Sequence, residues 1–185
     1  MIAEEGALPG GVVLRRARIE DAWALSRAYR DNREHLAPWE PRRGERFFTE
    51  EGQHERLRDQ LKEYEGGRLM PWLFHLDGRV VGAITLSGIV KGPFCSAYLG
   101  YWTAADRQGQ GLAGAAVQIV SRVAREELGL HRMEATTLPE NAASQRVLKR
   151  CGFELIGTAP RYLHINGQWR DHRLYQRVLH DDPPY

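Results

Sequence analysis

Cysteine is scarce in this sequence. Among the 185 residues only Cys95 and Cys151 occur, and they lie far apart in the chain. Isolated cysteines form neither the paired spacing of a zinc site nor a disulfide framework. We therefore expect no bound metal, and we predict a reducing setting, the cytoplasm.

Long apolar runs and blocks of one charge are also missing. No run approaches the roughly 18 apolar residues that a membrane-spanning helix needs. The formal net charge is +2, and acidic and basic residues are mixed along the chain. We therefore expect no membrane partner and no direct binding of nucleic acid.

The first residues differ in composition from the rest. Residues 1–11 are small, acidic and rich in glycine, without the basic start and apolar stretch of a secretory signal. We interpret them as a flexible N-terminal tail. The remainder is long enough to bury a core, and no linker divides it, so we predict a single domain over residues 12–180.

Hydrophobic periodicity predicts a mixed α/β fold. Asp77-Gly78 and Asn166-Gly167 are hairpin turn signals. Ala22, Leu25, Ala28 and Tyr29 recur at helical spacing, in a helix that Asp21 could cap. We expect helices over 21–35, 49–66, 112–128 and 140–152. We expect strands over 12–17, 69–76, 80–90, 97–102 and 132–138, and then a strand over 153–156 that leads into a hairpin of 161–165 and 168–178.

The most informative stretch runs from Tyr98 to Ala124. An aromatic strand over 97–102 precedes Gln108-Gly109-Gln110-Gly111-Leu112-Ala113-Gly114, and an amphipathic helix begins at Leu112. A helix that starts in such a loop directs free amides and its positive dipole end outward, which suits an anion such as a diphosphate. A glycine turn without a ligand is the alternative. The loop lacks the Gly-Lys-Ser/Thr ending of a Walker loop.

This loop resembles the Gln/Arg-x-x-Gly-x-Gly/Ala signature of the GNAT acetyltransferase superfamily. A second block, Asn141-Ala142-Ala143-Ser144 through Gly152-Phe153, is similar to the Asn-containing helix of that family. The resemblance covers about residues 12–178. It implies a GNAT fold, with a mixed, mostly antiparallel central sheet of about six or seven strands, helices on both faces and a splayed coenzyme cleft, and it implies acetyl-coenzyme A as cosubstrate. The residues implied in coenzyme binding are Gly100, Tyr101, Trp102, Thr103, Gln108, Gly109, Gln110, Gly111, Leu112, Ala113, Gly114, Asn141, Ser144 and Arg146.

Three further segments resemble the ribosomal-protein-alanine N-acetyltransferases of the RimJ/RimL type, RimJ most closely. They are residues 36–41, with Pro38-Trp39-Glu40-Pro41, residues 90–101, and residues 162–172. The resemblance implies transfer of acetyl to the N-terminal alanine of a small-subunit ribosomal protein, by direct attack of the amine. It places Trp39, Glu40 and Tyr162 at the substrate. A core position for the Trp39 ring is the alternative.

The reaction needs a neutral amine, and Glu134 is the first candidate for its base. Strand alternation places Glu134 on one face with Arg132 and Thr136. A solvated ion pair with Arg132 is the alternative. The resemblance further implies that a backbone N–H within Gly100-Tyr101-Trp102 stabilises the oxyanion.

The helix of the second block supplies the other catalytic candidates. By resemblance, Asn141 contacts the pantetheine arm, and Ser144 contacts the coenzyme sulfur. A helix cap is the alternative for Asn141, and close helix packing for Ser144. Many family members have a tyrosine four residues before the glycine of Gly-Phe, as the acid for the thiolate. This chain has Leu148 there, so the proton donor is left open.

Three functions therefore remain at this point. The first is a protein N-terminal acetyltransferase with a ribosomal protein as partner. The second is an acetyltransferase for a small amine, such as an amino sugar, a polyamine or a xenobiotic. The third is a coenzyme-A-binding regulatory module without turnover. The sequence is compatible with a monomer or a homodimer. Scattered histidines, such as His75, His131, His164 and His172, are interpreted as packing or surface residues.

Overall fold

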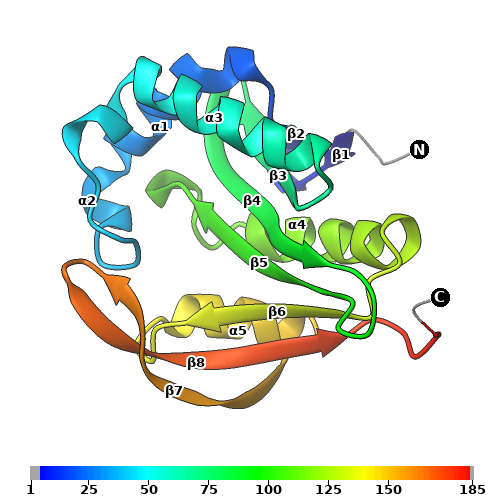
Figure 1. The fold of residues 1–185 in the computed structure, drawn as a ribbon. Coiled ribbons are helices and arrows are strands. Elements are labelled where there is room, and N and C mark those ends of the chain that lie inside the picture. Colours follow the sequence, from blue (N-terminus) through cyan, green and yellow to red (C-terminus); the bar gives the residue numbers. More distant parts are fainter. Residues whose placement is uncertain (1–4, 184–185) are drawn as a thin grey trace.

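A computed structural model describes residues 5–183 of the chain (Figure 1). One sheet of eight strands, in the order β1-β2-β3-β4-β5-β6-β8-β7, organises the described residues. The strands are β1 (Glu5–Ala7), β2 (Val13–Arg16), β3 (Leu69–Leu76), β4 (Arg79–Val90), β5 (Ser96–Thr103), β6 (Arg132–Thr137), β7 (Glu154–Ile165) and β8 (Gln168–Val178). The α-helices are α1 (Ala22–Asp31), α2 (Arg33–Leu36), α3 (Glu50–Glu65), α4 (Leu112–Arg122) and α5 (Ala142–Arg150).

The predicted mixed, mostly antiparallel sheet is confirmed, with eight strands where we expected about six or seven. Only β5 and β6 are parallel neighbours, and each other adjacent pair of strands is antiparallel. The additional strand, β1, pairs with β2, with Gly6 opposite Leu14. The prediction of a flexible tail is therefore wrong for residues 5–11, because their backbone extends the sheet and Leu8 is buried. Residues 1–4 lie outside the described residues.

Helices cover both faces of the sheet, and strand alternation divides the core between them. In β3, Trp72 and Phe74 join the cluster that contains the buried side chains of α4 and α5. Leu73, between them in sequence, joins the cluster under α1 and α3. This is the period of two that a strand with both faces buried requires. The predicted inner face of α1, which includes Leu25 and Tyr29, is confirmed as buried.

Local signals fixed most element ends. Asp77 and Gly78 have φ of 48° and 76°, and Asn166 and Gly167 have φ of 45° and 85°, as tight hairpin turns require. The C-terminal strand pattern was predicted less well. Residues 154–165 form one strand, β7, whose register with β8 shifts between Ala159 and Leu163. An irregular register of this kind leaves no clean period in the sequence.

The sheet opens between β5 and β6. Their parallel pairing is limited to Ser96–Tyr98 of β5 and Arg132–Glu134 of β6. Beyond these residues the two strands diverge towards α2 and the turn between β7 and β8 (Figure 1). The remaining residues of β5, 99–103, stay paired with β4 alone within the described chain. The predicted splay of the sheet is thus present at the position that follows Tyr98.

Asp21 anchors the start of the first helical layer, although it does not cap α1 as we predicted. Its carboxylate accepts a hydrogen bond from the backbone N–H of Arg18 at 2.7 Å and two from the guanidinium of Arg15 at 2.6 and 3.0 Å. The side chains of Asp21 and Arg15 are only 7% and 18% exposed. The carboxylate therefore joins β2 to α1, because its strongest partner lies on the strand.

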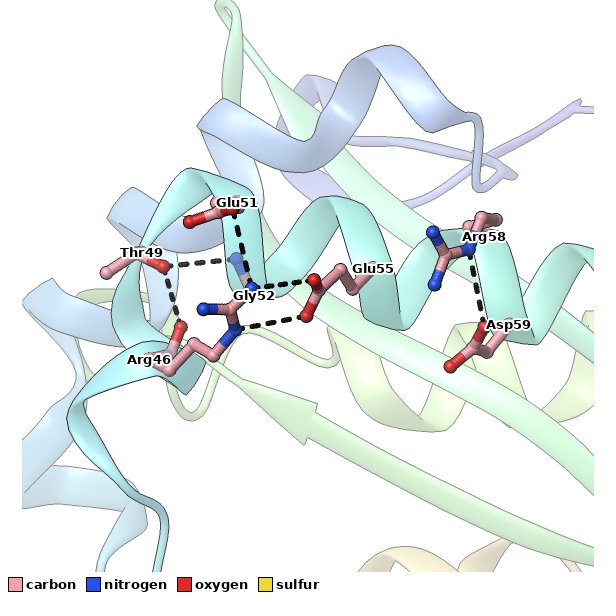
Figure 2. A network of polar contacts seen from close by, with 7 residues as sticks. All are labelled: Arg46, Thr49, Glu51, Gly52, Glu55, Arg58 and Asp59. Carbon is pink, nitrogen blue, oxygen red and sulfur yellow. Dashed lines mark hydrogen bonds and ion pairs between the residues drawn. The ribbon is translucent and has the colours of Figure 1, made fainter.

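A second charged network lies on the surface of α3 (Figure 2). Arg46 donates two hydrogen bonds to Glu55, at 2.7 and 3.1 Å, and also lies near Glu51. Thr49 accepts the N–H of Gly52 and so caps the helix, as its sequence position predicts. Arg46 and Glu55 are 61% and 41% exposed, so water screens this pair.

Replacement of Asp21 by alanine should lower the free energy of unfolding by about 3 kcal/mol, because it leaves the guanidinium of Arg15 partly buried without its carboxylate. The measurement is urea unfolding at neutral pH. Glu55→Ala is the matched control, since Glu55 also accepts two hydrogen bonds from one arginine but is exposed. An equal loss in the two variants would contradict the role given to Asp21.

Candidate functional site

The divergence of β5 and β6 creates the main cleft of the described chain. It has a volume of about 600 Å³. Its walls are the free part of β5, the end of β6, the glycine loop, the start of α5 and the segment between α2 and α3. These elements are far apart in sequence, and the opening of the sheet brings them together.

The glycine loop forms the first wall. Gly109 and Gly111 have φ of 72° and 79°, which favours glycine over other residues. The first described hydrogen bond of α4 joins Ala115 N to Gly111 O at 3.0 Å. The amides of residues 112–114 therefore precede the helical ladder, as at any helix start. A Cβ on Gly109 or Gly114 would meet nothing within 4 Å, so a ligand can approach the backbone closely. The wall suits an anion.

The start of α5 forms the opposite wall. Asn141 caps this helix, since its Oδ1 accepts the N–H of Ser144 at 3.0 Å. The predicted alternative for Asn141 is thus present, and both residues also line the cleft. The hydroxyl of Tyr101, on β5, lies 2.9 Å from Ser144 Oγ. Burial raises the pKa of Tyr101 to about 12, so the phenol keeps its proton at neutral pH.

Leu148 lies one turn further along α5. Its side chain is buried and lines the cleft, so no helix tyrosine is present at this position.

Most of the predicted coenzyme residues line the cleft, but three predicted site residues do not. Glu134 is the last residue of β6 that pairs with β5, and its carboxylate oxygen lies 2.9 Å from Arg132. Tyr162 and Gln110 also lie outside the lining. Those that line it are Trp39, Glu40, Gly100, Tyr101, Trp102, Thr103, Gln108, Gly109, Gly111, Leu112, Ala113, Gly114, Asn141, Ser144 and Arg146.

The three remaining residues have other neighbours. Tyr162 packs against His172, with ring centres 5.8 Å apart. The Gln110 side chain donates to the carbonyl of Asp106 at 3.3 Å. Burial, followed by the charge of Glu134, raises the pKa of Tyr98, which pairs with Glu134 across β5 and β6. The ion pair with Arg132, our alternative for Glu134, is present, but it is not solvated as we expected, since the two side chains are only 25% and 17% exposed.

A hydrogen-bonded bridge between two loops flanks one end of the cleft. The backbone N–H of Asn166, in the turn between β7 and β8, donates to the carbonyl of Glu40 at 3.0 Å. The Glu40 side chain lines the cleft and is 23% exposed. Desolvation raises the pKa of its carboxyl, and the charges of Arg43 and Arg56 oppose this only in part. This carboxyl is a candidate proton acceptor, because burial makes it a stronger base than a solvated one.

The structure adds two histidines that the sequence did not reveal. His172 is buried, its ring packs against Tyr162 as our interpretation of it as a packing residue expects, and it also lines the cleft. Its Nδ1 lies 3.0 Å from the carbonyl of Arg170, which can only accept, so this nitrogen is the donor. His35 also lines the cleft, 3.2 Å from the carbonyl of Thr103. No motif marks His35, and His172 ends the segment 162–172 that resembles the RimJ/RimL type, although that resemblance assigned it no role.

Within residues 5–183, no three His, Cys, Asp or Glu side chains gather as a metal site would require. No helix over the same residues combines the length and the apolar character needed to cross a bilayer.

Comparisons with known proteins agree with the geometry. Residues 12–154 match the family described as "Acetyltransferase (GNAT) domain". The [ribosomal protein uS5]-alanine N-acetyltransferase of Escherichia coli (strain K12) is 37% identical over 176 residues, which are 94% of this chain and 90% of that protein.

Two solved structures are similar over almost the whole chain. The ribosomal-protein-S5-alanine acetyltransferase from Vibrio fischeri has a TM-score of 0.90 at 31% identity, over 96% of this chain and 97% of its own. Mycobacterium smegmatis RimJ in complex with CoA-disulfide has a TM-score of 0.89 at 37% identity, over 94% of this chain and 86% of its own.

Replacement of Gly111 by alanine should weaken the binding of acetyl-coenzyme A about tenfold, which corresponds to about 1.4 kcal/mol. The added methyl group alters the left-handed residue that starts α4 and aims its amides. Isothermal titration calorimetry measures the effect. Gly78→Ala is the matched control, since Gly78 has φ of 76° in a distant hairpin turn and a Cβ there meets nothing within 4 Å. Equal weakening in both variants would show that the loop does not bind the coenzyme.

Proposed function

This chain belongs to the GNAT acetyltransferase family, and from that premise we propose that it acetylates the N-terminal alanine of a small-subunit ribosomal protein. Similarity to the Escherichia coli and Vibrio fischeri enzymes, over almost the whole chain, supports this acceptor. The observation that supports it most directly in this molecule is the bridged end of the cleft. A bridge between Glu40 and Asn166 leaves room for the end of a chain, whereas a chain that passes through needs an open groove.

Acetyl-coenzyme A is the cosubstrate that fits the cleft. The amides of residues 112–114 are placed to bind its diphosphate, and a Cβ-free surface at Gly109 and Gly114 allows close approach. Asn141 and Ser144 lie on the opposite wall, where the pantetheine arm would pass. We propose that the acetyl carbonyl lies beside the free part of β5, whose backbone N–H groups would stabilise the oxyanion.

The attacking amine needs little activation by the enzyme. An α-amine has a pKa near 8, so roughly a tenth is neutral at pH 7. Its nitrogen attacks the thioester carbon, a C–N bond forms, the C–S bond breaks, and the bond pair leaves with sulfur. The proton released from nitrogen goes to a base. We assign this role to Glu40 in preference to Glu134, because Glu40 lines the cleft and Glu134 is paired with Arg132.

A small amine is the second candidate acceptor. The bridge beside the cleft is equally compatible with it, because a small molecule needs no room beyond the bridge. The two candidates differ in what must lie outside the bridge. A peptide needs room for its following residues, and a small amine does not.

A peptide that begins with alanine should release thiol from acetyl-coenzyme A, and the same peptide with a blocked N-terminus should not. The reason is that the free α-amine is the nucleophile. A thiol-trapping assay measures the release. The residues that follow the alanine in the peptide should be those of a small-subunit ribosomal protein. Release with a panel of small amines, and none with the free peptide, would replace the ribosomal acceptor with a small-molecule one.

Glu40→Gln should lower kcat/KM for the amine acceptor about tenfold or more and leave the KM for acetyl-coenzyme A near its normal value. Burial raises the pKa of Glu40, so the wild-type rate should rise with pH as this carboxyl loses its proton. The variant should lose that limb of the profile. Steady-state kinetics over a range of pH measures both effects.

The matched control for this variant is Glu45→Gln, because Glu45 lies on the same segment but is exposed and paired with Arg33. It should behave as the wild type. A loss in Glu134→Gln that exceeds the loss in Glu40→Gln would return the role of base to Glu134.

A further inference from the structure

A second, smaller cavity adjoins the cleft at Glu40. It has a volume of about 150 Å³, and Leu36 and Glu40 line both cavities. Asn166, which forms the bridge with Glu40, lines the smaller cavity but not the cleft. The smaller cavity therefore lies at the bridge, beside the carboxyl to which we assign the proton of the reacting amine.

Three arginines, Arg33, Arg42 and Arg43, line this smaller cavity, which we call the arginine cavity. Its volume is below the roughly 300 Å³ at which sites for drug-sized ligands begin, so it has room for a side chain but not for a cofactor. Guanidinium groups donate hydrogen bonds and accept none, so the matching ligand group is an anion. The remaining lining residues are Tyr29, Ala37, Pro41 and Phe48.

Two of the three guanidinium groups lie over aromatic rings. The guanidinium of Arg33 lies 4.3 Å from the ring centre of Phe48, and that of Arg43 lies 4.6 Å from the ring centre of Phe47. Such cation–π contacts hold a long side chain in one arrangement. Less side-chain entropy is then lost when an anion binds.

The third guanidinium, that of Arg42, lies against the turn between β7 and β8. A Cβ added to Gly167 would lie 3.1 Å from the guanidinium carbon of Arg42, so the group packs closely on the backbone of this glycine. Arg42 is exposed, and no carboxylate within residues 5–183 forms an ion pair with it. Its N–H groups are therefore available to a ligand.

The charges of the arginine cavity are not balanced. Arg33 donates two hydrogen bonds to Glu45, at 2.6 and 3.0 Å. Arg43 lies 3.8 Å from the carboxylate of Glu40, beyond hydrogen-bond distance. These two carboxylates face three guanidinium groups, so one positive charge, that of Arg42, lacks a counterion among the described residues.

We propose that the arginine cavity is a specificity subsite for an acidic side chain, aspartate or glutamate, at the second or third residue of the acceptor peptide. The inference rests on the proposed function, because it takes the α-amine to lie in the cleft at Glu40. An extended chain advances about 3.3 to 3.6 Å per residue, so a peptide that starts beside Glu40 reaches the adjoining cavity within two or three residues.

The carboxylate of that side chain would pair with Arg42. An arginine can bind a carboxylate through two parallel N–H···O bonds, which gives geometric selectivity as well as affinity. The arginine cavity also supplies the room outside the bridge that a peptide needs and a small amine does not.

The first test compares peptides that begin with alanine and differ at one position. With glutamate at the second or the third residue, kcat/KM should exceed that of the matching glutamine peptide about tenfold, because only glutamate forms charge-assisted bonds. The matching lysine peptide should be poorer still. Thiol release from acetyl-coenzyme A measures each value.

The second test changes the sign of the charge at Arg42. Arg42→Gln should bring the ratio of kcat/KM for the glutamate and glutamine peptides to about one, and Arg42→Glu should make the lysine peptide the best of the three. Arg58→Gln is the matched control. Arg58 is 65% exposed on α3 (Figure 2), pairs with Asp59 at 3.5 Å and lines neither cavity, so this variant should keep the preference for glutamate.

Two results would overturn the subsite alone. One is equal kcat/KM for the glutamate and glutamine peptides in the wild type, at both positions. The other is a preference for glutamate that persists in both Arg42 variants. In either case acetylation of these peptides would leave the proposed function standing. Acetylation of no peptide that begins with alanine would reject both the proposed function and the subsite.

Discussion

The early end of the pairing between β5 and β6 is the constraint on which the rest of the site depends. After Tyr98 and Glu134 the strands diverge, so β5 keeps a row of backbone groups that no strand on that side satisfies within the described chain. An open edge in the middle of a sheet is costly unless something binds it. The backbone groups of β5 that face the cleft therefore lack strand partners, and an extended ligand in the cleft can form hydrogen bonds with them.

The two halves of the sheet stay together although they part in the middle. At the closed end three residue pairs join β5 to β6. Across the cleft Tyr101 on β5 bonds to Ser144 on α5, and at the far end Asn166 bonds to Glu40. These contacts hold the walls at a fixed separation. A site built on strands and helix starts is in this way kept rigid, as the alignment of an amine with a thioester requires.

Local sequence signals predicted the hairpin turns and the start of α4. Asp77-Gly78 and Asn166-Gly167 predicted their hairpins because each supplies two positive φ values, and Gly111 predicted the start of α4 for a similar reason. Alternation also placed Glu134 on the correct face. Alternation does not predict where the pairing of β6 with β5 ends. The end of this pairing decides whether Glu134 lies in the cleft or beside it. The Tyr101–Ser144 bond and the position of His172 depend on the angle of the splay, which no local pattern encodes.

The acidic residues of the molecule differ in whether an arginine lies close to their carboxyl group. Asp21, Glu55 and Glu134 each lie within 2.6 to 2.9 Å of an arginine nitrogen, on the fold or on its surface. Glu40 differs, because the nearest nitrogen of Arg43 is 3.8 Å away while desolvation still raises the pKa of its carboxyl. A carboxyl that is desolvated without a close partner destabilises the fold when it ionises. This loss of stability is offset if an incoming ammonium or amine pairs with the carboxylate. Glu40 lines the cleft, where we propose that the amine enters.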